Sequence, residues 1–529
     1  MENKRGTWGS KFGFLMAAIG SAVGLGNIWG FPYKMGKCGG FTFLLVYLFL
    51  AVFVGMVIMC GELSLGRLTK KAPIEAYQKV SKKYNWLGWL AVLSPFLIMT
   101  FYSVLGGYCI YYVVINFLGL FGNVRDSASF SALLTSPFIS LLVLALFMVI
   151  CGFIVAGGVE SGIEKFNKIG MPALAVMLLI IIIKSWTLPN AGEGLKFMLV
   201  PGYAVKKGFI EKAPGLIEVL GTAGGQMFFS LSLAMGAMIT YGSYLDKDTN
   251  IIESSRNICI ADTAVALMAG FAVIPAAVAN GINNGLAVGE IKLSGPNLLF
   301  STLQDVFCGM GKVGALFGII FYLLVLIAAV SSAISLMEVI TAHFLDSAAE
   351  KGRHLDRKKV SLYVSVAIFA LSCLVAADGL GSNGISPADM LGATVRGWND
   401  CWLDFMDTWS EGMMMPIGAM LMAVMIGWEL KPDFVLKEMS NGADVKGYEK
   451  FFRICITYVV PVIMAFVLAG QMISFFGNGK NDWFFYVFAL LVLAGFAAWT
   501  YFCPEETPLA KLTEKSTAIR CGKQNKKKK

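Results

Sequence analysis

The sequence predicts an all-α polytopic membrane protein with 12 transmembrane helices. The first observation behind this fold class is composition. Some 57% of the residues are hydrophobic, only 15% are charged, and the mean hydropathy is +0.69, whereas a soluble protein of this length carries far more charge. The second observation is that the apolar residues gather in runs of about 20, the length that a helix needs to cross a bilayer. Most of the chain is therefore expected to lie in membrane spans.

The apolar runs divide the chain in a simple way, and we treat residues 1–529 as one transmembrane domain. Residues 1–11 precede the first run, residues 12–503 form the twelve-span core, and residues 504–529 form a basic tail. The predicted spans are residues 12–36, 41–66, 87–118, 138–157, 166–187, 216–241, 258–282, 312–345, 360–377, 402–428, 454–475 and 483–503.

The distribution of basic residues predicts the orientation of these spans. An even number of spans puts both ends of the chain on one side, and short cytoplasmic loops are rich in lysine and arginine. Basic clusters precede the first span, separate the second from the third, follow the eighth and end the tail. Both termini are therefore expected in the cytoplasm, with the protein in the plasma (inner) membrane. The loop after the fifth span is also basic, but it is longer, and longer loops are weaker evidence.

Charge, cysteine and histidine usage limit the possible functions. The net charge of +9 falls in loops and the tail, so it gives no sign of nucleic acid. The apolar composition indicates the lipid bilayer as the partner. The 11 cysteines are scattered and only two histidines are present, which favours buried thiols over a metal cluster. No nucleophile–base pair stands out either, so we expect no enzyme activity.

The first span is a poor continuous helix. Residues 17–33 read A-A-I-G-S-A-V-G-L-G-N-I-W-G-F-P-Y, in which glycine recurs, proline follows and Asn27 supplies an amide. One interpretation is a tight glycine-rich packing face. The other is a break, whose freed carbonyls and half-helix terminus bind a cation and a carboxylate.

The sixth span repeats this pattern and favours the second interpretation. From Gly221 it reads G-T-A-G-G-Q-M-F-F-S-L-S-L-A-M-G-A-M-I-T-Y, so Ser230, Ser232 and Gly236 interrupt an apolar run. Spans one and six are an odd number of spans apart and therefore cross the bilayer in opposite directions. Two interrupted helices in corresponding positions indicate a transporter built from inverted repeats, with its site at the repeat interface.

Two further spans carry candidate polar features. The fifth contains Gly162 and Pro172, which indicate either an ordinary kink or a helix end that can unwind and admit water. The eighth contains Ser331, Ser332 and Ser335. A single serine there often bonds back to its own helix, but adjacent hydroxyls beside a free carbonyl suit a small hard cation.

Two acids lie in otherwise apolar sequence, Glu62 in the second span and Asp262 in the seventh. An ionisable group at that depth is a functional hypothesis by default. Glu62 could serve a structural role by accepting hydrogen bonds from the free amides of a broken helix. Asp262 is the better candidate for an ion ligand.

These motifs together resemble the neurotransmitter:sodium symporter family, and its bacterial amino-acid members in particular. The similarity runs from about Arg5 to the eleventh span. It implies two inverted five-helix repeats, formed by spans 1–5 and 6–10, with two further spans. It also implies discontinuous first and sixth helices and two sodium ions.

The resemblance assigns site residues one by one. Sodium site 1 would use Ala22, Asn27, Ser230 and Asp262, and sodium site 2 would use Gly20, Val23, Ala328, Ser331 and Ser332. The amino-acid substrate would contact Ala22, Gly24, Leu25, Gly26, Ile98, Tyr102, Phe229, Ser230, Ser232, Met235, Ser335 and Leu336. The gates would use Arg5, Trp8, Tyr244 and Asp346 on the cytoplasmic side and Asp407 outside. The water path would follow a helix break between Gly162 and Pro172.

The sequence also departs from the family's pattern. An arginine usually stands where Gly30 is found, paired outside with an acid whose counterpart is Asp407, so the usual outer ion pair cannot form. Met235 replaces a phenylalanine of some members, and Ala234 replaces a common glycine. The pocket is expected to be apolar and adaptable.

The function implied is a sodium-coupled symporter that imports neutral amino acids, hydrophobic or aromatic ones in particular. Chloride-dependent relatives have an asparagine where Asp262 stands and a serine where Ala266 stands, so chloride independence is expected here. The alternative is an amino-acid-gated channel, or a non-transporting sensor on the same fold. A channel needs a continuous polar lining, whereas the polar groups here gather at one depth.

Overall fold

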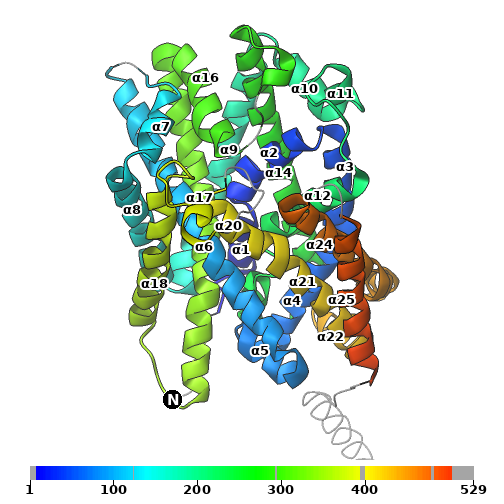
Figure 1. The fold of residues 1–529 in the computed structure, drawn as a ribbon. Coiled ribbons are helices and arrows are strands. Elements are labelled where there is room, and N and C mark those ends of the chain that lie inside the picture. Colours follow the sequence, from blue (N-terminus) through cyan, green and yellow to red (C-terminus); the bar gives the residue numbers. More distant parts are fainter. Residues whose placement is uncertain are drawn as a thin grey trace, which may run out of the picture.

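The structure is a computed structural model that describes residues 7–122, 124–291, 293, 295–392, 400–477 and 482–502. Over these residues the chain forms a bundle of helices, with no β-strand in the described ranges (Figure 1). Arg5 and the basic tail lie outside the described residues. Each of the twelve predicted spans contains helix where it is described, with non-helical residues inside the first and the sixth.

The spans are built from α-helices and short π-helical segments, the latter labelled η. In chain order they are α1 (Lys11–Ala22), η1 (Gly26–Gly30) and α2 (Phe31–Lys37); α3 (Phe41–Leu50), η2 (Ala51–Gly55) and α4 (Met56–Thr69); α6 (Asn85–Gly119); α8 (Pro137–Ala156); η4 (Val159–Glu164) and α9 (Lys165–Trp186); α12 (Leu216–Ser230) and α13 (Ala237–Ser243); α14 (Ile251–Asn283); α17 (Gly311–Glu350); α18 (Arg357–Asp378); α20 (Trp402–Asp407), η7 (Thr408–Met414), α21 (Met415–Val424) and η8 (Met425–Glu429); α23 (Lys446–Ile454), η9 (Cys455–Val459) and α24 (Val460–Phe476); and α25 (Trp483–Phe502).

Shorter helices connect the spans. They are α5 (Pro73–Val80), η3 (Lys82–Tyr84), α7 (Ala128–Leu134), α10 (Ala191–Leu199), α11 (Tyr203–Lys206), η5 (Val288–Glu290), α15 (Gly295–Asn297), η6 (Leu298–Thr302), α16 (Leu303–Gly309), α19 (Pro387–Leu391) and α22 (Pro432–Met439). In Figure 1, α5, α22 and the turn between α17 and α18 lie at the lower end, and α10, α11 and α16 at the upper end. We call the lower end the basic end, because the lysine-rich loops around α5 and after α17 lie there.

Ten of the helical spans in the described residues are long and apolar enough to cross a membrane by themselves. The first predicted span raises this to eleven if it is counted across its bend, because α1 and the η1–α2 helix meet at 45°. The predicted sixth span is divided between α12 and α13, with residues 231–236 non-helical between them. The two spans expected to be discontinuous are therefore both interrupted.

At both interruptions, a polar side chain accepts a hydrogen bond from a backbone amide that has lost its helical partner. In the first, α1 ends at Ala22 and the amide of Gly24 donates to Asn27 Oδ1 over 3.0 Å. In the second, Ser232 and Ala234 have positive φ values of 52° and 59°. The amide of Ala234 donates to Glu62 Oε1 over 2.6 Å. A buried amide without such a partner would be strongly destabilising in a membrane.

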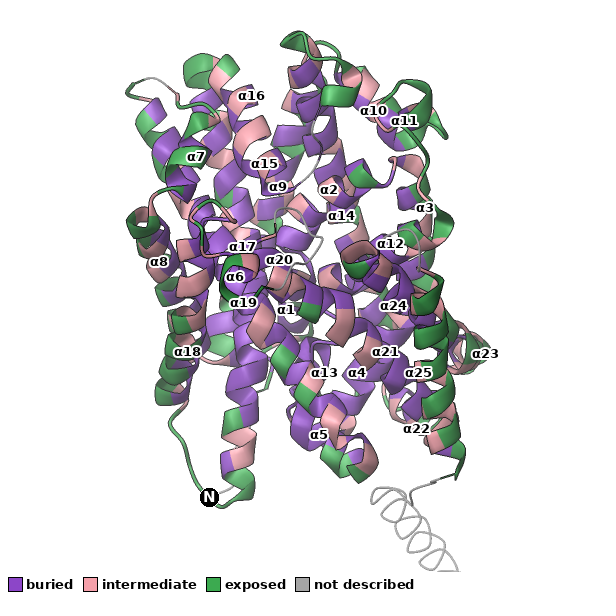
Figure 2. Cartoon of the chain, viewed as in Figure 1, coloured by how far each residue is buried: buried purple, intermediate pink, exposed green. Residues whose placement is uncertain are grey.

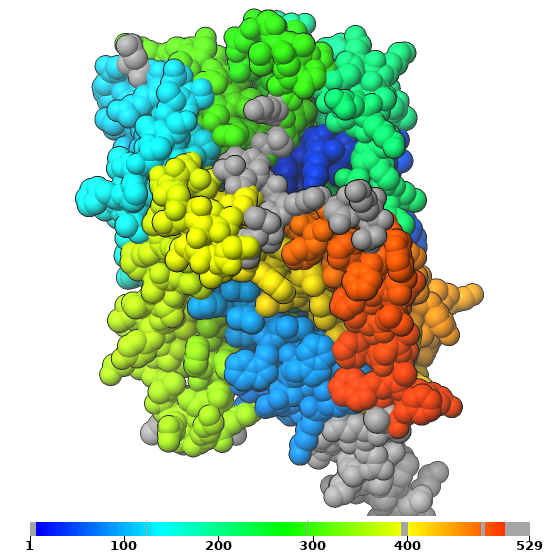
Figure 3. Space-filling model, in the orientation of Figure 1, coloured from blue at the N-terminus to red at the C-terminus, as the bar shows by residue number. Residues whose placement is uncertain are grey.

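The surface of the bundle is apolar, as a bilayer requires. Figure 2 shows buried residues in the interior and exposed ones along the outer sides of α18 and α25. Large apolar side chains on that surface include Phe153 of α8, which is 81% exposed, and Tyr501 of α25, which is 80% exposed. Figure 3 shows α25 at the edge of the molecule, against the segment of α5 and α6. Tyr84 and Thr500 hydrogen bond there over 2.9 Å.

Candidate functional site

The centre of the candidate site is the carboxylate of Asp262 on α14. This side chain is 0% exposed. It accepts hydrogen bonds from Asn27 Nδ2 over 2.7 Å and from Ser230 Oγ over 2.9 Å. No ion pair involves Asp262 in the part of the chain that the structure describes. A buried carboxylate without a protein cation is stabilised by neutral donors alone, and it offers a negative charge to a cation.

Asn27 and Ser230 reach Asp262 because each lies next to an interrupted helix. Asn27 lies in η1, where its side chain bonds the amide of Gly24 as well as Asp262. Ser230 is the last residue of α12. Ala22, the last residue of α1, is 2% exposed. The two breaks thus bring the side chains of Asn27 and Ser230 to one carboxylate.

Tyr47 of α3 is a contact that the sequence reasoning missed. Its hydroxyl donates to Asp262 Oδ2 over 3.2 Å and to Ser230 Oγ over 3.3 Å, and the residue is 0% exposed. The only sequence signal for this contact was a tyrosine within the apolar run F-L-L-V-Y-L. Tyrosine is common in such runs, so it did not mark Tyr47 as a site residue. Tyr47 helps to hold the carboxylate in place.

A second oxygen cluster lies where α17 meets the break in the first span. Ser332 Oγ lies 3.0 Å from the carbonyl oxygen of Ser21, 3.3 Å from that of Gly20 and 3.5 Å from that of Val23, so its single hydroxyl hydrogen is shared among the carbonyls at the end of α1. Ser331 Oγ donates to the carbonyl of Ala328 over 2.8 Å and to that of Val23 over 3.4 Å. All of the residues predicted for sodium site 2 are brought together. The serines bond back to their own helix and also reach the broken one.

Both clusters fit a small hard cation. Their donors are carbonyl, hydroxyl, amide and carboxylate oxygens, which hard cations prefer to nitrogen or sulfur. In the described residues there is no group of three or more histidine, cysteine or acidic side chains that could hold a metal ion. The first cluster carries a formal negative charge, and the second is neutral.

The residues predicted to contact substrate surround the break in the first span. The hydroxyl of Tyr102 on α6 accepts a hydrogen bond from the amide of Leu25 over 3.0 Å. Its ring lies 6.2 Å from that of Phe229, centroid to centroid. A Cβ on Gly24 would lie 2.6 Å from the Tyr102 hydroxyl, and one on Gly26 would lie 2.7 Å from Phe229 Cδ1. Both glycines therefore allow a close approach that no other residue permits.

The remaining predicted contacts fall into a polar and an apolar group. Ser232 Oγ donates to the carbonyl of Ser21 over 2.7 Å, and Ser21 Oγ donates to Ser335 Oγ over 2.8 Å. The apolar residues are Ile98, Met235 and Leu336, which are buried in the same core. Ala234 adopts a positive φ, a conformation that favours glycine.

The structural role suggested for Glu62 is confirmed. Glu62 lies on α4, is 1% exposed and accepts the amide hydrogen of Ala234 in the second break. This acid therefore stabilises the interrupted helix, and Asp262 is the acid in contact with the predicted ion ligands.

Aromatic and charged contacts close the bundle at the basic end. Trp8 is 8% exposed, donates to the carbonyl of Tyr241 over 3.2 Å and packs on the rings of Tyr241 and Tyr244. Tyr244 donates to Glu338 over 2.6 Å, and Glu338 forms an ion pair with Arg357. The sequence reasoning grouped Tyr244 with Asp346 and missed the Glu338–Arg357 pair.

Asp346 and Glu164 make two further contacts at this end. Asp346 accepts a hydrogen bond from the amide of Ala72 over 2.7 Å. Glu164 of η4 binds the amide of Gly9 over 2.8 Å and the hydroxyl of Ser10 over 3.1 Å. The segment that precedes α1 is thereby tied to η4. The available signal for Glu164 was an acid two residues before the fifth predicted span.

The expected water-path segment is helical in this structure. Gly162 lies within η4, and a Cβ there would lie 2.1 Å from the carbonyl oxygen of Ile154. Pro172 lies inside α9, which is continuous from Lys165 to Trp186. Asn167 lies between them, and its Oδ1 has no hydrogen-bond partner among the described residues. A Cβ on Gly20 would lie 1.9 Å from that oxygen, so α9 closely approaches the oxygen cluster around Ser331 and Ser332.

At the opposite end, Gly30 lies beside Gln226 of α12. Gln226 donates to the carbonyl of Gly26 over 2.7 Å, and a Cβ on Gly30 would lie 2.7 Å from Gln226 Oε1. One helical turn farther along α2, Lys34 forms an ion pair with Glu411 of η7, and both side chains are largely buried. Glu411 follows Asp407 by one turn, and the sequence reasoning missed this shifted pair.

Comparisons with known proteins agree with this arrangement. The sequence profile of the Sodium:neurotransmitter symporter family matches residues 5–122 and 123–509. The uncharacterized sodium-dependent transporter YhdH of Bacillus subtilis is 34% identical over 90% of this chain and 100% of its own length. The sodium- and chloride-dependent GABA transporter 2 of Mus musculus is 25% identical over 71% of this chain and 68% of its own. The crystal structure of MhsT in complex with L-phenylalanine is similar with a TM-score of 0.76 and 33% identity, covering 88% of this chain and 100% of that one.

Proposed function

Because the chain belongs to the sodium:neurotransmitter symporter family, we propose that it imports neutral amino acids with apolar or aromatic side chains in symport with sodium. The observation that carries this proposal is the buried carboxylate of Asp262, which faces ligands from both interrupted helices. The whole chain would act as one transporter domain of twelve spans, with spans 1–5 and 6–10 as inverted repeats. It would lie in the plasma membrane with both termini in the cytoplasm.

Sodium would bind at two places. One ion would be held by Ala22, Asn27, Ser230 and Asp262, and its positive charge would balance the buried carboxylate. The other would be held by the carbonyls of Gly20, Val23 and Ala328 with the hydroxyls of Ser331 and Ser332. An ion at the first site that also touches the substrate carboxylate couples the two binding events, and each then raises the affinity of the other by the same factor.

The substrate class follows from the space at Gly24. Monoamine-carrying relatives have an aspartate at this position, which meets an amine that lacks a carboxylate. Glycine leaves room for the α-carboxylate, which Tyr102 and the amides of the first break would hold. The side chain would extend among Ile98, Phe229, Met235 and Leu336. The bound L-phenylalanine of MhsT, a protein similar over 88% of this chain, supports an aromatic or apolar substrate.

Alternating access would open the two ends in turn. When the basic end opens, η4 would unwind at Gly162. The contacts that close this end would break, namely those of Trp8, Tyr244, Glu338 and Asp346. At the opposite end the Lys34–Glu411 pair would take the place of the usual arginine–aspartate pair. Lys34→Gln should then raise the rate of substrate release outward about tenfold while leaving sodium affinity unchanged, as measured by dissociation of labelled substrate. Unchanged release would exclude this pair from the gate.

Transport is tested with the purified full chain in liposomes. Labelled tyrosine, tryptophan, phenylalanine or leucine should accumulate with an inward sodium gradient and not with an equal potassium gradient. Counterflow without a gradient should be seen in sodium alone. Uptake independent of sodium, or binding without any counterflow, would favour a channel or a sensor instead. Tighter binding of tyramine than of tyrosine would contradict the substrate class.

Chloride independence is part of the same proposal. Asp262 supplies a permanent negative charge beside the ion, and Ala266, one turn away on α14, has no hydroxyl for an anion. Replacing chloride by gluconate at fixed sodium should therefore leave the uptake rate unchanged. A severalfold fall would overturn this account of how the site is neutralised.

A further inference from the structure

Two adjoining hollows open on the outer surface of the bundle at the basic end. The larger, of about 750 Å³, lies between α8, η4, α9 and α17, and its walls include Gly162, Phe166 and Ile327. The smaller, of about 470 Å³, lies between α8 and α18. Phe153, Ala156 and Lys358 line both, so the two hollows adjoin at these residues.

The walls of these hollows are apolar and face the surroundings of the bundle. Phe153 is 81% exposed, Ile169 of the larger hollow 69% and Leu362 of the smaller 61%. At a rise of 1.5 Å per residue, the larger hollow extends about 12 Å along α9 from Lys165 to Ala173. The smaller extends about 16 Å along α18 from Lys358 to Phe369. Two such grooves have the length and polarity of acyl-chain segments.

Two lysines stand at the basic ends of the grooves. Lys165 and Lys358 both line the larger hollow. Neither side chain has an ion-pair or hydrogen-bond partner among the described residues. The neighbouring cations differ, since Lys168 pairs with Glu164 over 2.6 Å and Arg357 pairs with Glu338. Two uncompensated positive charges thus lie at the mouth of two apolar grooves.

We propose that this paired groove is a binding site for an anionic phospholipid of the bilayer. The phosphate would lie between Lys165 and Lys358, and one acyl chain would enter each groove beside Phe153. Basic pockets between spans at the cytoplasmic surface attract anionic headgroups, because the lysine charge adds to the burial of the chains. This inference rests on the groove and its charges and does not depend on the transport activity.

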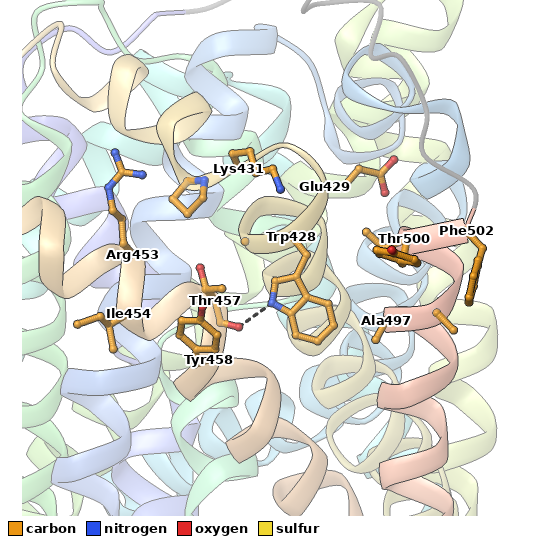
Figure 4. A pocket seen from close by; sticks show the side chains of 14 residues that line it. Trp428, Glu429, Lys431, Arg453, Ile454, Thr457, Tyr458, Ala497, Thr500 and Phe502 are labelled. Atoms are coloured by element: carbon orange, nitrogen blue, oxygen red, sulfur yellow. Dashed lines mark hydrogen bonds between the residues drawn. The ribbon is translucent and has the colours of Figure 1, made fainter.

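A third hollow provides a contrast. It has a volume of about 1030 Å³ and lies between η8, η9 and α25 (Figure 4). Its arginine and glutamate are already paired, Arg453 with Asp433 and Glu449, and Glu429 with Lys83 over 3.1 Å. Trp428 donates to the carbonyl of Thr457 inside it over 2.7 Å. Lys431 also lines this hollow and, like Lys165 and Lys358, has no ion-pair or hydrogen-bond partner among the described residues. The proposed lipid site therefore differs from the third hollow in holding two uncompensated lysines instead of one.

The position of the site has a structural consequence. Gly162 of η4 forms part of the wall of the larger hollow. A lipid bound there packs directly against η4 and should slow hydrogen exchange of the backbone amides around residues 157–166. That effect gives a readout in the folded protein that is independent of uptake.

The test is titration of the delipidated full chain in detergent with phosphatidylglycerol or phosphatidylcholine of equal chain length. Bound lipid is counted by native mass spectrometry. We expect phosphatidylglycerol to bind more tightly, and Lys165→Gln with Lys358→Gln to weaken its binding roughly thirtyfold. The matched control, Lys351→Gln with Lys359→Gln, removes the same charge outside the groove and should change the affinity less than twofold. Ala173→Phe should weaken binding by filling the larger groove without altering charge.

Each outcome decides the proposal. Equal affinity for the two lipids, equal losses in both double variants, or full binding by Ala173→Phe would overturn it. If the groove variants lose phosphatidylglycerol binding and exchange protection while sodium-driven uptake is absent in every protein, the lipid site stands and the transport proposal fails.

Discussion

The two oxygen clusters at the centre of the molecule differ in charge and in neighbours. The cluster around Asp262 contains a buried carboxylate and joins both interrupted helices to α14 and α3. The cluster around Ser331 and Ser332 is neutral and joins only the first interrupted helix to α17. It lies next to Asn167 of α9, close to Gly162.

This difference suggests a division of labour. The charged cluster can neutralise an ion permanently and lies beside the amides that would hold a substrate carboxylate, so it suits coupling. The neutral cluster binds through dipoles alone, which is weaker, and its neighbour is the segment proposed to unwind. It suits an ion that is released first toward the basic end.

The largest expected effect is that of Gly24→Asp, because Gly24 lies between the two clusters. A Cβ there would lie 2.3 Å from Ser332 Oγ and 2.6 Å from the Tyr102 hydroxyl. The new carboxylate would also lie where the substrate carboxylate is expected. Substrate binding should fall at least about a hundredfold, since a buried unpaired charge costs about 3–5 kcal/mol. Scintillation-proximity binding in sodium checks this. The protein should still be monodisperse, and binding within tenfold of wild type would contradict the assignment.

Asp262→Asn tests the charged cluster. Asparagine keeps an oxygen ligand but removes the charge, so sodium should bind at least about tenfold more weakly. Adding Ala266→Ser to this variant could create a chloride requirement. Sodium titration of substrate binding, with and without chloride, measures both effects. An unchanged sodium affinity would show that Asp262 only bonds local polar groups.

Ser331→Ala tests the neutral cluster. It removes one hydroxyl oxygen that would bind the cation and leaves the carbonyl oxygens of Val23 and Ala328 in place. The lost interaction is worth about 1 kcal/mol, so sodium affinity should fall about fivefold and chloride should remain irrelevant. The same titration applies. A loss as large as that of Asp262→Asn would remove the contrast between the clusters.

The smallest effects are expected for Pro172→Ala and Gly162→Ala, which act on the neighbour of the neutral cluster. Both should slow uptake about threefold and leave outward-facing substrate binding nearly unchanged. Initial uptake rates and binding are compared in the same preparation. Gly162→Ala also places a Cβ 2.1 Å from the carbonyl oxygen of Ile154, so Pro172→Ala is the cleaner variant. Equal losses of binding and transport would indicate a folding defect.

Local sequence was enough for the spans and for the two interruptions. Runs of about 20 apolar residues have one stable form in a bilayer. The helices overlap the predicted spans, although α14 begins at Ile251 and α23 at Lys446, before the predicted starts at 258 and 454. Among the described residues, ten helical spans, or eleven with the bent first one, are long and apolar enough to cross a membrane. Glycine, serine and asparagine at one depth predicted the breaks. The resemblance then supplied ligands that the structure brings within hydrogen-bond distance, such as Asn27 with Asp262 and Ser332 with Gly20.

The amino-acid sequence is thus sufficient to predict the class of the protein, its broken helices and its central polar residues, because these depend on composition and local backbone preference. The pairing of buried polar and charged groups depends instead on how the helices pack. Tyr47 reaches Asp262, Glu338 pairs with Arg357, and Lys34 pairs with Glu411. Each contact joins residues from different helices, and helix packing sets their approach. The periodicity of a single span shows which residues share a face, and the neighbouring helix determines what that face contacts.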